Sequence, residues 1–579
     1  LFEKLVRDVR PESVAEHFKM SLDEARHSTP SARMKHVVDL FVLAFQTRAT
    51  RGMGKGEKKL SYLLIKELET VAGADAVCKV VHLLPHFGYW KDLLLLIEHE
   101  PSNMVKNRCI ALISEQLRVD EAELAAAREE KRPPKLSLVA KYAPREGAHF
   151  DKGPFKLAKS VATSMFGSAN ATASMRKYRK LVSSLNTELN TTEIFMSAER
   201  YEEINFARVA SLCLQRNRKA FLNEEVKGKM CLSYDMTGNR HPHDPARVQA
   251  RVNLRKAMVD KQGVKGKELQ PHEIVKKCMR DDLSTVEGDL MNAQWNSMRD
   301  GVVKALGEVD KERDVSGTSK SVDLGKLVAL VDVSGSMTGT PMEVAIALGI
   351  LVSELATTAF RDRVLTFESN PYWVDISGCS TILQKVKTIH NAPWGMSTNF
   401  EAACERILQT VERAKLSPDN IPDLIVFSDM QFDKAQNDYG ITACKWSTHF
   451  GRIQRRFAEV GVKVCGKPYA APRIIFWNLR GDTVGFPVSA DSPNTQMLSG
   501  FSPALLKLVM SGADLEATEK EIKNADGTTS VVLTGPTPAE TVRMALDDEA
   551  FYPVRQALSG MKSGPLAGYV WEPKTVDVE

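Results

Sequence analysis

Apolar runs of strand length alternate with amphipathic helices from residue 327 to residue 479, and this alternation constrains the fold more than any other feature. Parallel strands need long crossovers, usually helices, so the pattern predicts a parallel sheet covered by helices on both faces. In doubly wound, Rossmann-like sheets of this kind, ligands lie at the carboxyl ends of the strands, near the switch in strand order. The expected strands are LVALVD (327–332), RVLTFES (363–369), YWVDI (372–376), PDLIVFSDM (422–430) and PRIIFWNL (472–479).

The residues before this region, up to about residue 310, have the pattern of amphipathic helices almost throughout. MKHVVDLFVLAFQTR (34–48) and LSYLLIKELETVAG (60–73) place apolar residues at i, i+3, i+4 and i+7. The helices follow one another with short turns marked by Gly or Pro and without a strict sequence period, so helix pairing alone predicts a HEAT-like α-helical module. A polar segment at 310–326 marks the boundary. We therefore expect residues 1–315 to form the helical module and residues 316–579 to form the sheet domain.

The C-terminal tail carries two local signals. EIKNADGTTSVVL (521–533) predicts a hairpin around the turn pair Asp526 and Gly527. Thr537 and Glu540 have the spacing of a capping box, which predicts a helix start. We expect this tail to extend the sheet domain or to pack on it rather than to form a third domain.

Composition bounds the class of protein. The 579 residues are too many for one core, 26% of them are charged, and no apolar run approaches the roughly 18 to 20 residues that span a bilayer. Nine cysteines are scattered without a CxxC pair, which favours reduced thiols and an intracellular, cytoplasmic location. The chain begins at Leu1 rather than at a methionine, so a targeting segment to an organelle stays open.

Three segments with small oxygen-bearing side chains are expected at the same edge of the sheet. Asp332, Ser334 and Ser336 end the first strand, Thr398 precedes a helix, and Asp429 ends the strand DLIVFSD. Two carboxylates with neutral hydroxyls form a hard-oxygen environment suited to Mg²⁺ or another divalent cation. Such a set leaves the cation with open positions for a carboxylate or phosphate of a partner. The competing interpretation is a set of helix caps and turns, which favour the same residue types.

The motif DVSGS resembles the DxSxS motif of von Willebrand factor A domains. Thr398 in MSTNF and Asp429 in FSDM are similar to the second- and third-loop ligands of the metal-ion-dependent adhesion site of that family. The resemblance implies that Asp332, Ser334, Ser336, Thr398 and Asp429 bind Mg²⁺, directly or through water.

A helical-repeat module followed by an A domain resembles the TROVE proteins, the family of the Ro autoantigen. TRATRGMGKGEKKLSYLLIKEL (47–68) looks like the glycine-rich helix start of that family, with Met53 replacing a glycine. HFGYWKDLL, KYAPREG, MSAERYEEINFARVAS, RNRKAFL and PHEIV are similar to a TROVE-like family of unknown function, and the likeness covers most of residues 35–555. The resemblance implies a helical module that binds structured RNA and single-stranded RNA ends.

Basic residues gather in the helical half. Between residues 131 and 185 we count twelve Lys or Arg against two acids, which favours an anionic partner such as RNA, although a solvated surface segment is the plain alternative. Tyr178 lies between two basic pairs, and we interpret it as a packed side chain rather than a base-stacking one. The predicted RNA-binding residues are Arg48, Arg51, Lys55, Lys58, Lys59, Arg176, Lys177, Arg179, Lys180, Arg216, Arg218 and Lys219.

These patterns favour a non-enzymatic RNA-binding or ribonucleoprotein component with a Mg²⁺-dependent A domain for a second partner. A scaffold that binds proteins through both halves is the main alternative. A Mg²⁺-dependent hydrolase is disfavoured because the sequence offers no evident nucleophile or general base.

Overall fold

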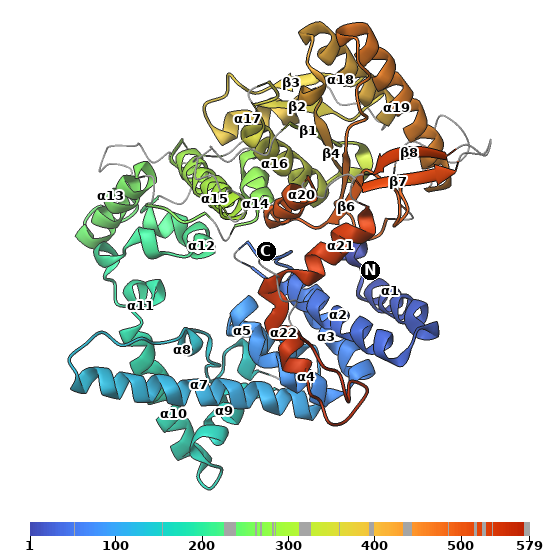
Figure 1. Cartoon of the computed structure of the whole chain (residues 1–579). Helices are drawn as coiled ribbons and strands as arrows, with labels where there is room; N and C mark the ends of the chain where they lie inside the picture. The colour runs from blue at the N-terminus through green and yellow to red at the C-terminus, as the bar shows by residue number, and fades with distance from the viewer. Residues whose placement is uncertain are drawn as a thin grey trace.

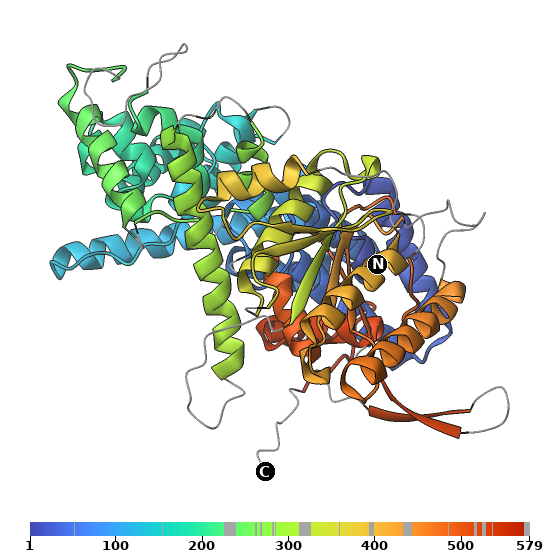
Figure 2. The same cartoon turned by 90° about the horizontal axis from the view of Figure 1, so that it is seen from above.

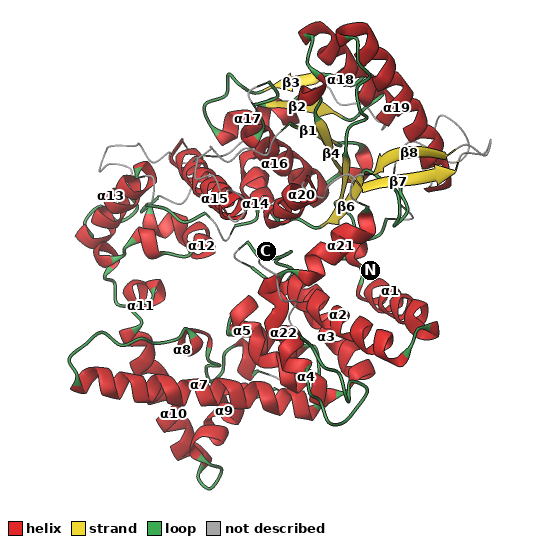
Figure 3. Ribbon diagram, in the orientation of Figure 1, coloured by secondary structure: helices red, strands yellow, loops and turns green. Residues whose placement is uncertain are grey.

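The computed structural model describes residues 1–50, 52–152, 155–224, 239–260, 263–266, 269–280, 283, 285–311, 326–357, 359–392, 399–431, 443–483, 486–513, 518–523, 529–534 and 537–572. It is a mixed α/β protein in which a helical half precedes a half built around a six-stranded sheet (Figures 1 and 3). Among the described residues, no helix combines the length and the apolar character that crossing a membrane requires.

The helical half contains fifteen α-helices among its described residues, and local signals explain several of their boundaries. Thr29 caps the second helix, whose first residue is Pro30, and Gln270 with Glu273 forms a capping box ahead of Pro271. The helices are α1 (Pro11–Glu24), α2 (Pro30–Arg48), α3 (Lys58–Ala72), α4 (Ala74–Val80), α5 (Leu84–Phe87), α6 (Lys91–Glu98), α7 (Asn103–Glu129), α8 (Val139–Tyr142), α9 (Leu157–Phe166), α10 (Ala171–Glu188), α11 (Thr192–Ser197), α12 (Ser211–Phe221), α13 (Pro245–Val259), α14 (Pro271–Cys278) and α15 (Thr285–Lys311).

The path of these helices returns to the sheet. From α1–α6 the chain runs outward through α7–α10, comes back through α11–α13, and places α14 and α15 beside the sheet domain (Figure 1). The helical half therefore meets the sheet domain at both of its ends, because residues 1–9 also lie against the sheet.

The second half has the predicted strand–helix alternation. Its strands are β1 (Leu327–Val331), β2 (Arg363–Thr366), β3 (Trp373–Asp375), β4 (Asp423–Ser428), β5 (Ile474–Asn478), β6 (Thr495–Ser499), β7 (Thr518–Lys523) and β8 (Thr529–Thr534). Its α-helices are α16 (Thr340–Leu355), α17 (Ile382–His390), α18 (Phe400–Ala414), α19 (Ala443–Cys465), α20 (Leu506–Ala513), α21 (Pro538–Asp547) and α22 (Tyr552–Leu558).

The main sheet has the strand order β3-β2-β1-β4-β5-β6, and every neighbouring pair is parallel except β2 and β3. Ala329 and Val331 of β1 belong to the core that contains α16, whereas Val328 and Leu330 belong to the core that contains α18 and α19. Alternate residues of β1 therefore face opposite helical layers, as expected for a strand buried on both faces. Figure 2 shows the sheet from above, between these layers.

The C-terminal tail differs in part from its prediction. The hairpin is present as β7 paired antiparallel with β8, although the predicted turn at Asp526 and Gly527 lies outside the described residues. The capping box of Thr537 and Glu540 starts α21, which packs on β6, α20 and α2. Helix α22 packs on α2 and α4 of the helical half, so the tail contacts both halves and not the sheet domain alone.

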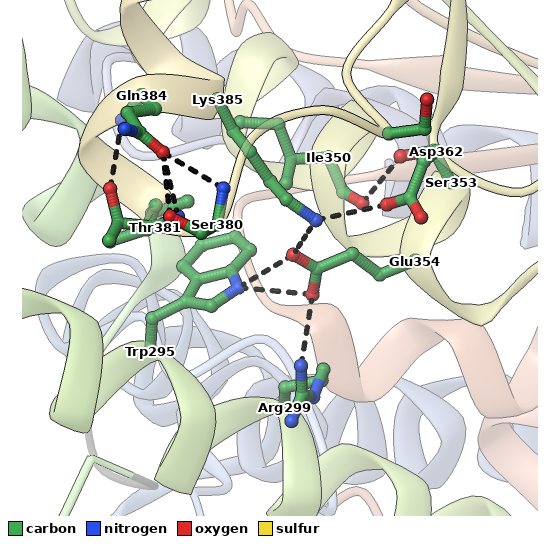
Figure 4. Close-up of polar contacts among 12 residues, drawn as sticks. Trp295, Arg299, Ile350, Ser353, Glu354, Asp362, Ser380, Thr381, Gln384 and Lys385 are labelled. Carbon is green, nitrogen blue, oxygen red and sulfur yellow. Dashed lines mark hydrogen bonds and ion pairs between the residues drawn. The ribbon is translucent and has the colours of Figure 1, made fainter.

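A buried polar network joins the two halves on the side of α15 (Figure 4). Glu354 of α16 accepts hydrogen bonds from the indole N–H of Trp295 at 3.1 Å and from Lys385 Nζ at 3.0 Å. Lys385 also donates to Asp362 at 2.9 Å, and Arg299 lies 3.8 Å from Glu354. One hydrophobic core runs from Phe2 through both halves to Tyr569, so the boundary near residue 315 does not separate two independent cores.

Candidate metal centre and basic surface

The candidate metal centre lies where the strand order reverses. After β1 the chain continues to β2 on one side, whereas β4 lies on the other side of β1. Asp332 follows β1 and Asp429 follows β4, so both carboxylates lie at the carboxyl edge of the sheet at this switch point. Both side chains are fully buried.

Asp332 is held by donors from both strand ends. Its Oδ1 accepts the backbone N–H of Ser334 at 2.9 Å, and its Oδ2 accepts the hydroxyl of Ser428 at 2.6 Å. The hydroxyls of Ser334 and Ser336 lie 3.0 Å apart. Burial raises the pKa of the Asp332 carboxyl to about 6, and the charge of Asp429 also raises it, while the hydrogen bonds from Ser428 and Ser334 oppose the shift.

Asp429 leaves one oxygen without a partner. Its Oδ1 accepts the backbone N–H of Gln431 at 3.1 Å, but its buried Oδ2 has no hydrogen-bond partner among the described residues. Met430 directly after it adopts φ +65°, a left-handed conformation that a side chain other than glycine rarely takes. A buried carboxylate oxygen without a donor is costly, and a cation bound there would relieve that cost.

The donor set fits a hard divalent cation. No three His, Cys, Asp or Glu side chains of the described part gather as a metal site, so a cation here depends on the serine hydroxyls as well as on the two carboxylates. Asp332, Ser334, Ser336 and Asp429 come from two adjacent strand ends, as predicted, whereas Thr398 lies outside the described residues.

Three further residues brace these loops, and sequence reasoning missed them. Ser428 bonds Asp332; a hydroxyl at the last position of the strand was the available signal. Arg480 donates to the backbone carbonyl of Ser336, and Thr483 donates to the backbone carbonyl of Asp429 at 3.0 Å. Arg480 and Thr483 belong to no local sequence motif. They lie in the loop after β5, and only the fold places this loop next to the candidate metal centre.

Two of the predicted RNA-binding residues are buried, and the prediction is wrong for them. Arg48 is 0% exposed and pairs with Asp92 at 2.6 Å. Lys55 is also 0% exposed and donates to the backbone carbonyl of Phe2 at 2.6 Å and to the hydroxyl of Ser499 at 2.6 Å. Their partners are distant in sequence, so the glycine-rich segment that looked like a surface loop is folded into the core.

The other predicted basic residues lie on the surface or close to it. Arg218 is mostly buried and pairs with Glu287, and Arg179 is exposed but pairs with Glu146 at 2.8 Å. Arg51 lies outside the described residues. The remaining predicted residues are exposed, and they are Lys58, Lys59, Arg176, Lys177, Lys180, Arg216 and Lys219.

Tyr178 is a packed residue, as we predicted. It is 1% exposed, and its hydroxyl donates to the backbone carbonyl of Pro144 at 2.7 Å. The basic side chains on either side of it point outward from α10, whereas the tyrosine ring joins α10 to the connector that follows α8.

Comparison with known proteins identifies relatives but no activity. Residues 326–546 match a family described as a domain of unknown function, DUF7788, and residues 104–230 match another domain of unknown function, DUF2828. The uncharacterized protein L728 of Acanthamoeba polyphaga mimivirus is 33% identical over 479 residues, which span 80% of this chain and 74% of the viral protein.

Proposed function

The chain belongs to the same family as the uncharacterized mimivirus protein L728, and from its own geometry we propose that it is a non-enzymatic RNA-binding protein with a second, Mg²⁺-dependent binding site. The sheet domain is proposed to be of the von Willebrand factor A type, and the helical half to be a HEAT-like module. RNA binds to the helical half, and a second partner binds at the metal centre.

The observation that carries the proposed metal centre is the unpartnered Oδ2 of Asp429. It is buried at the switch point of a doubly wound sheet, beside a second buried carboxylate on Asp332. Asp332, Ser334, Ser336 and Asp429 would hold the cation, and Mg²⁺ would leave positions open for a carboxylate or phosphate of the partner. Binding is favoured over catalysis because, in the described part of the chain, the two serine hydroxyls pair with each other and not with an imidazole or amine.

The metal is tested by titration calorimetry with Mg²⁺ on the wild type, Asp429→Asn and Asp332→Asn. Asparagine keeps the shape of each side chain but removes its charge, so we expect both variants to lose Mg²⁺ binding and to keep the fold by circular dichroism. Asp419→Asn is the matched control, because this exposed aspartate precedes β4 at the opposite edge of the sheet. Equal Mg²⁺ binding by all four proteins, or none by the wild type, would contradict the proposed centre.

RNA binding is supported by the exposed basic residues of α10. Arg176, Lys177, Arg179 and Lys180 occupy consecutive turns of one helix and are all exposed. We expect reversal of these four to glutamate to weaken RNA binding by several kcal/mol and to reduce the slope of log K against log salt by about 3, if all four meet phosphates of a single strand. Absence of measurable RNA binding by the wild type at about 50 mM salt would reject RNA as the ligand.

A protein-only scaffold is the second candidate, and two ion pairs favour it. Arg179 and Arg218 already have carboxylate partners, Glu146 and Glu287, which lower the charge available to RNA. Docking of a protein at the metal centre should respond to EDTA more than to salt, whereas phosphate contacts weaken steeply with salt.

The cysteines support an intracellular, cytoplasmic location for either function. Cys109, Cys278 and Cys404 are buried free thiols, and Cys78, Cys213, Cys379 and Cys465 are free thiols as well. Free thiols of this kind are typical of a reducing compartment.

A further inference from the structure

Arg48 of α2 and Lys91 of α6 lie beside the carboxylate of Asp92, and Lys58 at the start of α3 and Arg216 of α12 lie within electrostatic range of them. Asp92 is fully engaged: it accepts Arg48 Nε at 2.8 Å, the hydroxyl of Tyr62 at 2.6 Å and the backbone N–H of Tyr89 at 2.7 Å. The other three cations, Lys58, Lys91 and Arg216, are exposed to solvent. The carboxylate of Asp92 therefore neutralises Arg48 and leaves an excess of positive charge.

Arg48 also has a buried donor that nothing satisfies. Its Nη1 is buried without a hydrogen-bond partner among the described residues. Donors of this kind are rare in native proteins, because each one loses its hydrogen bonds to water. This unpartnered donor is a second, independent observation that favours an anion at this place.

The charges of this junction act on one another. Lys58 is exposed but partly surrounded by protein atoms; this partial loss of water lowers its pKa, and the charge of Arg48 lowers it further. Lys91 and Arg216 act in the same direction, while Asp92 opposes them. Lys58 and Lys91 are also the first residues of α3 and α6, where the unpaired backbone N–H groups of the helices favour an anion.

An aromatic pocket adjoins the cations through Lys91. This pocket of about 250 Å³ is lined by Lys91, Lys141, Tyr142, Arg145 and Phe150 among others. Lys91 Nζ lies 5.6 Å from the centroid of the Phe150 ring.

Tyr89 links the pocket to the buried arginine. Its ring centroid lies 6.4 Å from that of Tyr142, and the guanidinium of Arg48 lies 5.4 Å from the Tyr89 centroid. Tyr89 thus lies between the pocket and Arg48, and Lys91 belongs both to the pocket and to the cation cluster, so we take the two together as one surface.

We propose that this surface binds one nucleotide of single-stranded RNA, with its phosphate at Lys58, Lys91 and Arg216 and its base in the pocket of Tyr142 and Phe150. The proposal rests on the proposed RNA binding and assigns it a site distinct from the basic face of α10. Cations beside aromatic rings suit a nucleotide because the phosphate meets the charges and the base stacks on a ring. Contacts of this type do not read the base sequence, so the site accepts any nucleotide.

The test compares a double charge reversal in the site with a matched reversal outside it. Lys58→Glu with Lys91→Glu changes two exposed lysines of the site, and Lys19→Glu with Lys66→Glu changes two exposed lysines elsewhere on α1 and α3. The probes are AMP, adenosine and a labelled single-stranded RNA of about ten nucleotides. Calorimetry measures the first two probes and fluorescence anisotropy measures the third, after thermal melting shows that each variant is folded.

We expect the site variant to bind AMP and RNA about tenfold more weakly or worse, and to lower the salt slope for RNA by about 1.4. The control variant should stay within about twofold of the wild type. Adenosine should bind the wild type more weakly than AMP, because it lacks the phosphate. Tyr142→Leu should weaken AMP and adenosine alike.

The outcomes separate this site from RNA binding in general. Equal RNA binding by the site and control variants would overturn the site and leave RNA binding standing. AMP binding that the site variant loses, without RNA binding by the wild type, would support the nucleotide site and reject the proposed function. Equal affinity of the wild type for AMP and adenosine, or no binding of any probe, would overturn the site.

Discussion

The buried Lys55 should make the free energy of unfolding rise with pH in the alkaline range, and this rise can be measured. Its side chain is fully buried, donates to the backbone carbonyls of Phe2 and Leu5 and to Ser499, and lies 4.1 Å from the centroid of the Phe2 ring. Burial lowers the pKa of Lys55 to about 7, although the charges of Glu3 and Glu57 raise it. The Lys55 side chain therefore binds a proton less readily in the native state than in the unfolded chain.

The sign and size follow from proton linkage. Between pH 7 and about pH 10.5 the unfolded chain keeps a proton on Lys55 that the native state has released, so the free energy of unfolding rises with pH in this window. Below pH 7 both states are protonated and the contribution of Lys55 is constant. The full rise is about 5 kcal/mol, and about 2 kcal/mol of it falls between pH 7 and pH 9.

The assay is urea unfolding of the wild type and of Lys55→Met at several pH values from 6 to about 9.5. Methionine keeps much of the volume without a titrating group, so the difference between the two proteins isolates Lys55 from other lysines and tyrosines. We expect the free energy of unfolding of the wild type to increase relative to that of the variant as pH rises. Parallel pH profiles for the two proteins would refute the reasoning, because they would mean that Lys55 has the same pKa in both states.

Three further outcomes are expected. Burial lowers the pKa of His272 to about 3, and the charges of Arg7 and Lys276 act the same way. Below pH 6.5 the unfolded chain therefore takes up a proton on His272 that the native state does not, so the wild type should lose about 2 kcal/mol of unfolding free energy relative to His272→Gln between pH 6.5 and pH 4.5, measured by urea unfolding. Lys385→Met should destabilise the protein by about 3 kcal/mol because it removes the cation that pairs with the buried Glu354 and with Asp362, and Glu354→Gln in the same chain should restore part of that loss in a double-mutant cycle. Tyr178→Phe should lower the free energy of unfolding by about 1 kcal/mol and leave RNA affinity unchanged. Weaker RNA binding by this variant would mean that Tyr178 contacts RNA.

The sequence predicted the elements that are apolar throughout and missed one that is polar. Strands β1 and β4 were expected at nearly their observed bounds because their interiors are continuous Val, Ile, Leu, Ala and Phe runs. Strand β6, TQMLS, was missed because Thr495, Gln496 and Ser499 are polar, yet all three are buried and hydrogen bonded. Local pattern cannot show that the partners of a polar residue lie far along the chain.

The same limit explains what was right and wrong at the candidate sites. Asp332 and Asp429 were placed together from sequence because each directly follows a strand, and the sheet itself brings parallel strand ends to one edge. Arg48 and Lys55 were misplaced because a basic, glycine-rich segment is equally compatible with a surface loop and with a buried turn. Only the positions of Asp92 and Ser499, 44 and 444 residues away, decide between them.

Hydrogen bonds near the start of the chain connect the loops of the candidate metal centre to the helical half. Asn478 at the end of β5 donates to the backbone carbonyl of Glu3 at 2.9 Å, and Asp8 accepts the backbone N–H of Gly481 at 3.0 Å. The same β5 loop carries Thr483, which bonds the backbone carbonyl of Asp429.

At the other end, two arginines of the C-terminal helices bind one carboxylate of the helical half. Arg543 and Arg555 lie 2.7 and 2.6 Å from Asp39, and although burial raises the pKa of Asp39, these two arginines bring it below its ordinary value. Dividing the chain near residue 315 would therefore separate residues 1–9 from the sheet that they contact. It would also separate α22 from α2 and α4. The candidate metal centre and the proposed RNA surface consequently belong to one folded unit, in which the loop that braces Asp429 also contacts residues 3–8 of the helical half.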